Sequence, residues 1–281
     1  MALEKYSTVL KMAQEGRYCV PAFNTYNYET IAWVIEVAEE EKRPVIVQLY
    51  PGYDFYIPLK VMCDAAKELA AHASVPVCVH LDHSATYEIA FAGLAAGFPS
   101  VMIDGSSLSF DENVALTAAV SRAAHALGCE VEAELGHVGS GSNLDDFATG
   151  GKFTDPDEAV KFIELTNVDA LAVSIGNAHG AYAATPNLQL DLLSKINDAV
   201  DIPLVLHGGS DIPDEQIKQA ITRGIAKVNI ATEYFRAMYK GYSASIAAAP
   251  DKDSLFEISQ MSKDSVKDFL RGKFNLLKAD V

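Results

Sequence analysis

The sequence predicts an α/β fold, a single (β/α)8 barrel with a C-terminal helical extension. Eight short runs of apolar or β-branched residues recur along the chain, and amphipathic segments of helical period lie between them. No linker-like stretch interrupts this alternation, and 281 residues with 49% hydrophobic content suffice for one barrel core. A doubly wound open sheet is the competing topology, but eight strands favour a closed barrel.

The expected strands are almost continuously apolar, as is typical of strands that are buried on both faces. They span residues 18–23, 44–49, 76–81, 100–103, 129–135, 170–175, 203–207 and 226–230.

The expected helices alternate with these strands and span residues 29–41, 59–73, 87–96, 113–127, 157–166, 188–200 and 214–223. Asp155 can cap the helix that begins at Pro156, with Glu158 closing a capping box, and residues 211–215 carry a similar start signal. An amphipathic helix is expected within residues 1–16. We treat residues 1–281 as one domain, with the barrel core at about 17–233 and the C-terminal helices at about 234–281.

Composition limits the kinds of partner. The chain has 22 Lys and Arg against 38 Asp and Glu, a formal net charge of −16, which disfavours nucleic acid and anionic membranes as partners.

The four cysteines lie far apart without a C-x-x-C pair, which indicates buried thiols in a reducing compartment. The N-terminus lacks the pattern of a signal peptide, and no apolar run is long enough to span a membrane. We therefore expect a soluble cytoplasmic protein.

Polar residues stand where the expected strands end. The third strand ends in Asp82-His83, the fourth in Asp104 and the fifth in Glu134. The sixth and seventh lead to His179 and His207. In a barrel these ends meet on one face, where barrel active sites are built.

Three histidines at strand ends are a typical zinc-binding set, because three imidazoles leave a fourth position for substrate or water. His83, His179 and His207 are therefore the candidate ligands. His80 either points inward and supports the metal ligands or packs in the core. His137 begins the long loop after the fifth strand, and its role is left open between the site and the surface. The remaining histidines, His72 and His125, lie on helices and are expected to be structural or exposed.

Glycine-rich turns adjoin two of these histidines and predict a phosphate site. Backbone N–H groups and helix N-termini bind phosphate without a basic side chain, and the loops after strands seven and eight form the usual phosphate site of barrels. The residues concerned are Gly180, Gly208, Gly209, Ser210, Asn229, Ala231 and Thr232.

Six motifs together resemble those of the class II, metal-dependent ketose-bisphosphate aldolases, the family of the fructose- and tagatose-bisphosphate aldolases. They are Leu81-Asp82-His83, Val101-Met102-Ile103-Asp104-Gly105-Ser106, Glu132-Ala133-Glu134-Leu135-Gly136, Ala178-His179-Gly180, Leu206-His207-Gly208-Gly209-Ser210 and Lys227-Val228-Asn229-Ile230-Ala231-Thr232. The resemblance extends from about Pro21-Ala22-Phe23-Asn24 to Glu233. It implies a (β/α)8 barrel that forms a homodimer or homotetramer.

The resemblance also implies the chemistry, which is reversible cleavage of a ketose (bis)phosphate to dihydroxyacetone phosphate and an aldehyde through a metal-stabilised enediolate. One zinc ion per subunit would bind the three histidines, and Asp82 would be the general acid and base on the aldehyde oxygen. Asp104 and Glu134 would hold an alternative metal position or orient ligands. Asn24 and the glycine-rich turns would bind the substrate and its phosphate, with a monovalent cation such as Na⁺ or K⁺ nearby. The setting would be carbohydrate metabolism of the glycolytic type.

Three departures concern the proton-abstracting base and the acceptor half of the site. The family's loop glutamate, which removes the donor proton, has no equivalent before Glu158, and the candidates to replace it are His137, Asp145 and Asp146. Tyr50 stands where the family tends to place a small hydroxyl residue. No arginine lies between positions 236 and 271, where the family commonly has one for the distal phosphate. These departures predict an acceptor other than glyceraldehyde 3-phosphate.

Three alternatives remain at this point. Lys227 could form a Schiff base as in class I aldolases, or it could be a buried structural ion pair. A zinc hydrolase on the same barrel would not explain the phosphate-binding turns. A catalytically weak barrel could serve as a structural or regulatory subunit.

Overall fold

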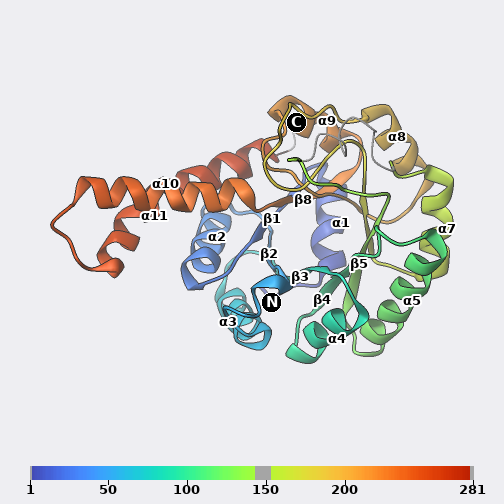
Figure 1. Cartoon of the computed structure of the whole chain (residues 1–281), viewed down its shortest axis with the longest axis horizontal. Coiled ribbons are helices and arrows are strands. Elements are labelled where there is room, and N and C mark those ends of the chain that lie inside the picture. Colours follow the sequence, from blue (N-terminus) through green and yellow to red (C-terminus); the bar gives the residue numbers. More distant parts are fainter. Residues whose placement is uncertain (1, 143–152, 279–281) are drawn as a thin grey trace.

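The computed structural model describes residues 2–142 and 153–278. Its eight strands are all parallel and close in sequence order, β1 to β8, into a barrel (Figure 1). The predicted (β/α)8 barrel is therefore confirmed. The strands are β1 (Val20–Asn24), β2 (Val45–Leu49), β3 (Val77–Ser84), β4 (Ser100–Ile103), β5 (Glu130–Leu135), β6 (Ala170–Val173), β7 (Leu204–Leu206) and β8 (Ile225–Ile230).

Helices surround the barrel, and their bounds agree with the predicted segments to within about three residues. They are α2 (Tyr28–Glu41), α3 (Leu59–His72), α4 (Tyr87–Ala96), α5 (Phe110–Ala126), α7 (Pro156–Thr166), α8 (Leu190–Ala199) and α9 (Asp214–Thr222), with a short 3-10 turn, η1 (Pro51–Tyr53), after β2. The expected C-terminal helices are α10 (Thr232–Ala248) and α11 (Leu255–Leu276), which pair and project from the barrel in Figure 1. Within the described residues, no helix has the length and apolar character that crossing a membrane requires.

The helix start signals are partly as predicted. The Asp155 side chain accepts hydrogen bonds from the N–H groups of Asp157 and Glu158, and Pro156 lies in the first turn of α7. The expected reciprocal bond from Glu158 does not form in this described helix, whereas α2 and α5 have full capping boxes. Asp211 does not cap α9 either, because its backbone is left-handed and its carboxylate pairs with Arg236.

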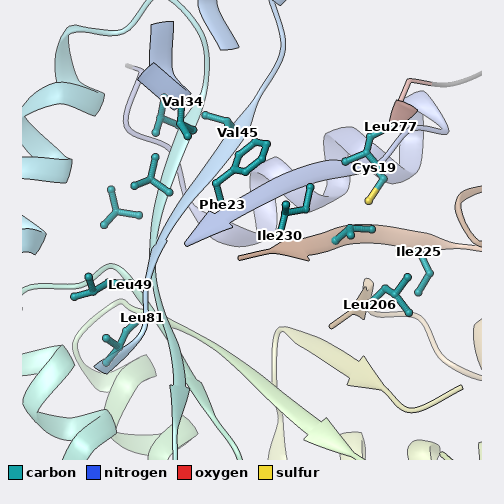
Figure 2. Close-up of a cluster of buried hydrophobic side chains, with 14 of the residues drawn as sticks. Cys19, Phe23, Val34, Val45, Leu49, Leu81, Leu206, Ile225, Ile230 and Leu277 are labelled. Carbon is teal, nitrogen blue, oxygen red and sulfur yellow. The ribbon is translucent and has the colours of Figure 1, made fainter. Parts of the chain in front are cut away.

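The core has two parts. Between the strands and the outer helices lie the side chains of Phe23, Val45, Leu81, Leu206 and Ile230, among others (Figure 2). This packing fixes the strands in place, so that the loops at their C-terminal ends rest on a rigid frame.

The second part of the core fills the barrel interior. Small and β-branched side chains of the strands meet the apolar face of α1 (Tyr6–Gly16) there. Figure 1 shows α1 inside the ring of outer helices. Its first turn is fixed by Ser7, whose N–H and hydroxyl both donate to Glu130 at the start of β5. α1 therefore closes the end of the barrel opposite the C-terminal ends of the strands.

The four cysteines are all free thiols, and three of them, Cys19, Cys63 and Cys78, are buried as predicted. Cys129 is partly exposed. Burial raises the pKa of the Cys78 thiol to about 12 and that of Cys63 to about 11, so these thiols are protonated and unreactive near neutral pH.

Candidate active site

A cavity of about 490 Å³ opens where the C-terminal ends of the strands meet. Twelve of the predicted site residues line it, namely Asn24, Asp82, His83, Asp104, His137, His179, Gly180, Gly208, Ser210, Asn229, Ala231 and Thr232. Three others, Glu134, His207 and Gly209, do not line it. Asp145 and Asp146 lie outside the described residues. Most of the predicted set thus converges on one cavity, although its members span more than two hundred positions of the sequence.

Four side chains could hold a metal ion, and two of them, His83 and His179, line this cavity. Ligand atoms of His83, Glu134, His179 and His207 all lie within 4.8 Å of one another. The His83 ring centroid lies 4.6 Å from those of His179 and His207. Two of the ligand atoms, Nδ1 of His207 and Oε2 of Glu134, are buried without a hydrogen-bond partner. Buried polar atoms are rarely left unpaired, so this donor set fits a divalent cation.

His83 depends on an irregular backbone for its position. The residue has φ +38°, and the register between β3 and β4 shifts between Leu81 and Ser84. A β-bulge of this kind redirects a side chain, and positive φ in a non-glycine residue is uncommon. Nδ1 of His83 then lies 3.0 Å from a carboxylate oxygen of Asp104. Since a carboxylate accepts hydrogen bonds, this contact leaves Nε2 of His83 as the metal-binding nitrogen.

His207 is held from below in the same way. Its Nε2 lies 2.6 Å from Oε1 of Glu132, which is fully buried in the barrel interior. Lys227 donates a 2.7 Å bond to Oε2 of Glu132, and neither side chain is exposed. Glu132 therefore fixes the ring so that Nδ1 of His207 faces the other ligands. Lys227 forms the buried ion pair of the structural interpretation, which leaves its amine engaged with Glu132 and disfavours the Schiff-base alternative.

His179 is placed by its backbone. Its N–H donates to the carbonyl of Gly139 at 2.8 Å, and its carbonyl accepts from the N–H of Gly141 at 2.7 Å. These two bonds join the loops that follow β5 and β6. The position of the third histidine thus depends on the conformation of the glycine-rich loop after β5.

Burial and the charges of neighbouring side chains shift the pKa values of the cluster. Burial alone would lower the pKa of His83, but Asp82, Asp104 and Glu134 raise it to about 9. Burial and the neighbouring histidines lower the pKa of His179 to about 3. Burial, together with the charge of Asp104, raises the pKa of Glu134 to about 8. The arrangement favours one positive charge in its centre, which a proton on His83 supplies here and a metal cation would supply better.

Asp82 stands beside this cluster, with Oδ1 3.9 Å from Nε2 of His83. The amide nitrogens of Asn24 and Asn229 donate to its two oxygens at 2.8 and 3.1 Å. Burial opposes ionisation, but the charge of His83 and the other nearby donors outweigh it and lower the pKa of Asp82. Asp82 is therefore a fixed carboxylate that can take a proton from a bound hydroxyl and return it.

Backbone groups and a helix end form the opposite wall. α10 begins at Thr232, and the side chain of Ala231 does not cap it. Ser210 lies beside it, accepting from the N–H of Glu233 at 3.3 Å. Gly208 and Gly180 have left-handed backbones, at φ +60° and +82°. A helix N-terminus with glycine turns suits an anion. The N–H of Gly209 instead donates to the carbonyl of Asn229, so it is not available to an anion.

The remaining wall is aromatic and hydroxylic. Tyr50 and Tyr53 lie edge to face at 5.5 Å between centroids, and Ser106 and Ser107 line the cavity with them. No Lys or Arg side chain lines the cavity in the described part of the chain. His137 also lines it, and its Nδ1 is buried without a hydrogen-bond partner.

The other histidines are now placed. His80 lies in the barrel interior, with its ring bonded to Ser100 and stacked on Tyr6, so it belongs to the core rather than to the ligand set. His72 is exposed, and His125 pairs with Asp169.

Some residues of this site were not singled out from the sequence. Gln48 donates to Asn24, and through it steadies Asp82. Glu132 holds His207, and the alternation of Glu132 with Glu134 along β5 is a signal that could have indicated two inward carboxylates. Tyr53, at the end of η1, and the two serines, in the loop after β4, have no comparable pattern.

Comparisons with known proteins agree with this geometry. The family model for class II fructose-bisphosphate aldolase matches residues 4–280. The YdjI aldolase from Escherichia coli K12 is 34% identical, with a TM-score of 0.85 over 99% of this chain and 98% of that chain. A putative fructose-1,6-biphosphate aldolase from Coccidioides immitis is 29% identical, with a TM-score of 0.86 over 97% of this chain and 96% of that chain. The fructose-bisphosphate aldolase from Campylobacter jejuni is 25% identical, with a TM-score of 0.82 over 98% of this chain and 95% of that chain.

These matches span nearly the whole chain and agree with the six motifs. They support aldol cleavage over the hydrolase and structural-subunit alternatives. The chain belongs to the class II fructose-bisphosphate aldolase family, and it is an aldolase, a carbon–carbon lyase.

Proposed function

We propose that the protein is a zinc-dependent aldolase that reversibly cleaves a ketose 1-phosphate to dihydroxyacetone phosphate and an uncharged aldehyde. The observation that carries this proposal is the cluster of three histidines beside Asp82, at a cavity whose other wall is a helix N-terminus. A metal site, a proton carrier and an anion site within one cavity are the parts that aldol cleavage of a phosphorylated ketose needs.

His83, His179 and His207 would hold the zinc ion, with Glu134 and Asp104 beside them as ligands of a second position or as orienting groups. When bound, the ion would polarise the carbonyl of the donor and so acidify the neighbouring carbon. The protein's own contribution is to orient the three imidazoles, through Asp104 on His83 and Glu132 on His207.

Asp82 would move the proton on the acceptor side. In cleavage it takes the proton from the hydroxyl whose carbon–carbon bond breaks, and in condensation it returns that proton to the aldehyde oxygen. The two amide donors that hold its carboxylate support this role, because they fix both oxygens beside the metal ligands.

His137 is our candidate for the base that removes the donor proton. It lines the cavity and has a buried ring nitrogen without a partner, which is the arrangement a base needs. Asp145 and Asp146 are the other two candidates, and substitution of each tests them.

The donor phosphate would bind between two groups of residues. Gly180, Gly208 and Ser210 lie on one side, and Ala231 and Thr232, at the start of α10, lie on the other. Asn24 and Asn229 would contact the donor hydroxyl. Gly209 would support this turn rather than contact the phosphate, since its N–H is already bonded. A monovalent cation such as Na⁺ or K⁺ would offset the phosphate charge in this acidic protein.

The acceptor half of the cavity favours an aldehyde without a phosphate. Within the described residues no Lys or Arg side chain lines this half, and two carboxylates, Asp82 and Asp104, already stand there. A second phosphate would therefore be repelled, whereas Tyr50, Tyr53 and the serine hydroxyls suit a neutral hydroxylated chain.

We further propose that the enzyme acts in the cytoplasm, in carbohydrate metabolism of the glycolytic type, as a homodimer or homotetramer. Apolar side chains on the projecting α10–α11 pair support self-association, because Tyr239, Leu255 and Phe256 are each 73% exposed.

The experiment is a panel of cleavage reactions with the zinc-loaded enzyme, in which ketose 1-phosphates are compared with fructose and tagatose 1,6-bisphosphates. We expect dihydroxyacetone phosphate from the monophosphates, with a kcat/KM above that for either bisphosphate. A higher kcat/KM for a bisphosphate would refute the uncharged acceptor. Absence of cleavage in the whole panel and of condensation with neutral aldehydes would refute the proposed substrate class.

A further inference from the structure

A buried polar cluster lies beneath the metal site, at the level of the barrel interior. Its centre is Glu132, which is 0% exposed. One carboxylate oxygen of Glu132 accepts from His207, and the other accepts from both Lys227 and the hydroxyl of Tyr6. A carboxylate can accept several hydrogen bonds at its two oxygens, so Glu132 is held at both ends.

Tyr6 reaches this cluster from outside the eight β/α units. It is the first residue of α1, the helix that closes the opposite end of the barrel, and it is 1% exposed. Its ring stacks on His80, with 4.8 Å between the centroids and 8° between the planes. The ring also lies 5.6 Å from Nζ of Lys227. Packing thus fixes the ring, so that the hydroxyl meets Glu132 in one orientation.

The contacts form one continuous chain from α1 to the cavity. The Tyr6 hydroxyl contacts Glu132, Glu132 holds Nε2 of His207, and Nδ1 of His207 faces the other ligands. Lys227 neutralises Glu132 but does not fix its rotation alone, because an ammonium group has no preferred direction of approach. The Tyr6 hydroxyl supplies a second, directional contact at the same oxygen.

We infer that Tyr6 is a positioning residue for the catalytic metal, which acts through Glu132 on the orientation of His207. α1 is accordingly part of the metal site's support and not only a closure of the barrel. This inference rests on the proposed function in one respect, which is that His207 binds a divalent cation. Removal of a group that orients a metal ligand typically weakens metal binding about 10- to 100-fold, and Tyr6 acts one contact further away. We therefore expect a loss of about tenfold.

The test is the substitution Tyr6→Phe, which deletes the hydroxyl and keeps the ring that stacks on His80. Ser7→Ala is the matched control, because Ser7 is the next residue of α1 and bonds to Glu130, a carboxylate of the same strand outside the cluster. His207→Ala reports loss of the ligand itself. The zinc dissociation constant of each metal-free protein is measured by competition with a chromophoric chelator. The absorption spectrum of the cobalt(II)-loaded protein reports ligand geometry, and thermal melting of the metal-free protein reports folding.

We expect zinc binding to Tyr6→Phe to be about tenfold weaker than to the wild type, with an altered cobalt spectrum, and Ser7→Ala to match the wild type in both. A purely structural role of Tyr6 would instead lower the melting temperature of Tyr6→Phe and leave its zinc affinity and cobalt spectrum unchanged. If His207→Ala loses zinc and Tyr6→Phe behaves as Ser7→Ala, the inference is wrong and the metal site stands. If the wild type binds no zinc, or binds it as tightly as His207→Ala, both are wrong.

Discussion

Replacing Asp82 by asparagine should separate the two halves of the reaction. The substitution keeps the shape of the side chain but removes its ability to take a proton. Both oxygens of Asp82 now accept from amide donors, at 2.8 Å from Asn24 and 3.1 Å from Asn229. The new amide group of Asp82→Asn has only one acceptor end, so one of these two bonds is lost, at about 1–3 kcal/mol.

Loss of a positioned proton carrier typically lowers kcat by about 10²- to 10⁴-fold, or about 3–5 kcal/mol in the barrier. We expect a fall of that size in aldol cleavage by Asp82→Asn. Removal of the donor proton does not use the acceptor oxygen, so exchange of that proton with solvent should stay within about fivefold of the wild type.

The assays are cleavage coupled to reduction of dihydroxyacetone phosphate by a dehydrogenase, and exchange of the donor hydrogen in D₂O followed by proton NMR. Zinc content is measured in parallel, since Asp82 lies beside His83. Asp211→Asn is the control, because Asp211 pairs with Arg236 outside the cavity. If Asp82→Asn slows exchange as much as cleavage, or leaves cleavage near the wild-type rate, the assigned role is wrong.

Three further outcomes follow from the structure. A Cβ at Gly208 would lie 1.9 Å from a backbone carbonyl oxygen, so Gly208→Ala should abolish measurable cleavage. Gly128 also has a positive φ, +73°, but faces open space, so the control Gly128→Ala should lose only about 1–2 kcal/mol of stability in chemical denaturation. Chelation of the metal should abolish cleavage, and added zinc should restore it; activity that survives chelation would contradict a metal-dependent site. Partial burial would raise the pKa of Glu36, but its hydrogen bonds with Lys263 and Lys267 outweigh burial and lower that pKa. The hydrogen bond with Lys267 likewise lowers the pKa of Glu40. These ion pairs therefore stabilise the fold fully above pH about 4.3, and the stabilisation is lost as pH falls through the lowered pKa values. Lys267→Met should lower the free energy of unfolding by about 1 kcal/mol at pH 7 and by less in acid.

The barrel and most of the cavity were predictable because both depend on local patterns. Strands buried on both faces are apolar throughout, and the residue that follows such a strand lies on the active face of the barrel. His83, His179 and His207 could therefore be grouped from their positions alone. Asp155 could be recognised as a cap for the same reason, because capping depends on neighbouring residues.

Features that depend on long-range contacts were less predictable. Asp211 pairs with Arg236, which lies on a later helix, instead of capping α9. The contact of Tyr6 with Glu132 joins residues more than a hundred positions apart. His83 gains its orientation from a β-bulge that no residue type announces. These relations arise only when the barrel closes.

Exchange of the donor hydrogen without any aldehyde present tests the central claim most directly. Wild-type protein, metal-free protein and His207→Ala are each incubated with dihydroxyacetone phosphate in D₂O, and deuterium at the hydroxyl-bearing carbon is followed by NMR. We expect incorporation of one deuterium by the zinc-loaded wild type and none above background by the other two. Equal exchange in metal-free protein, or no exchange in the zinc-loaded wild type, would contradict it.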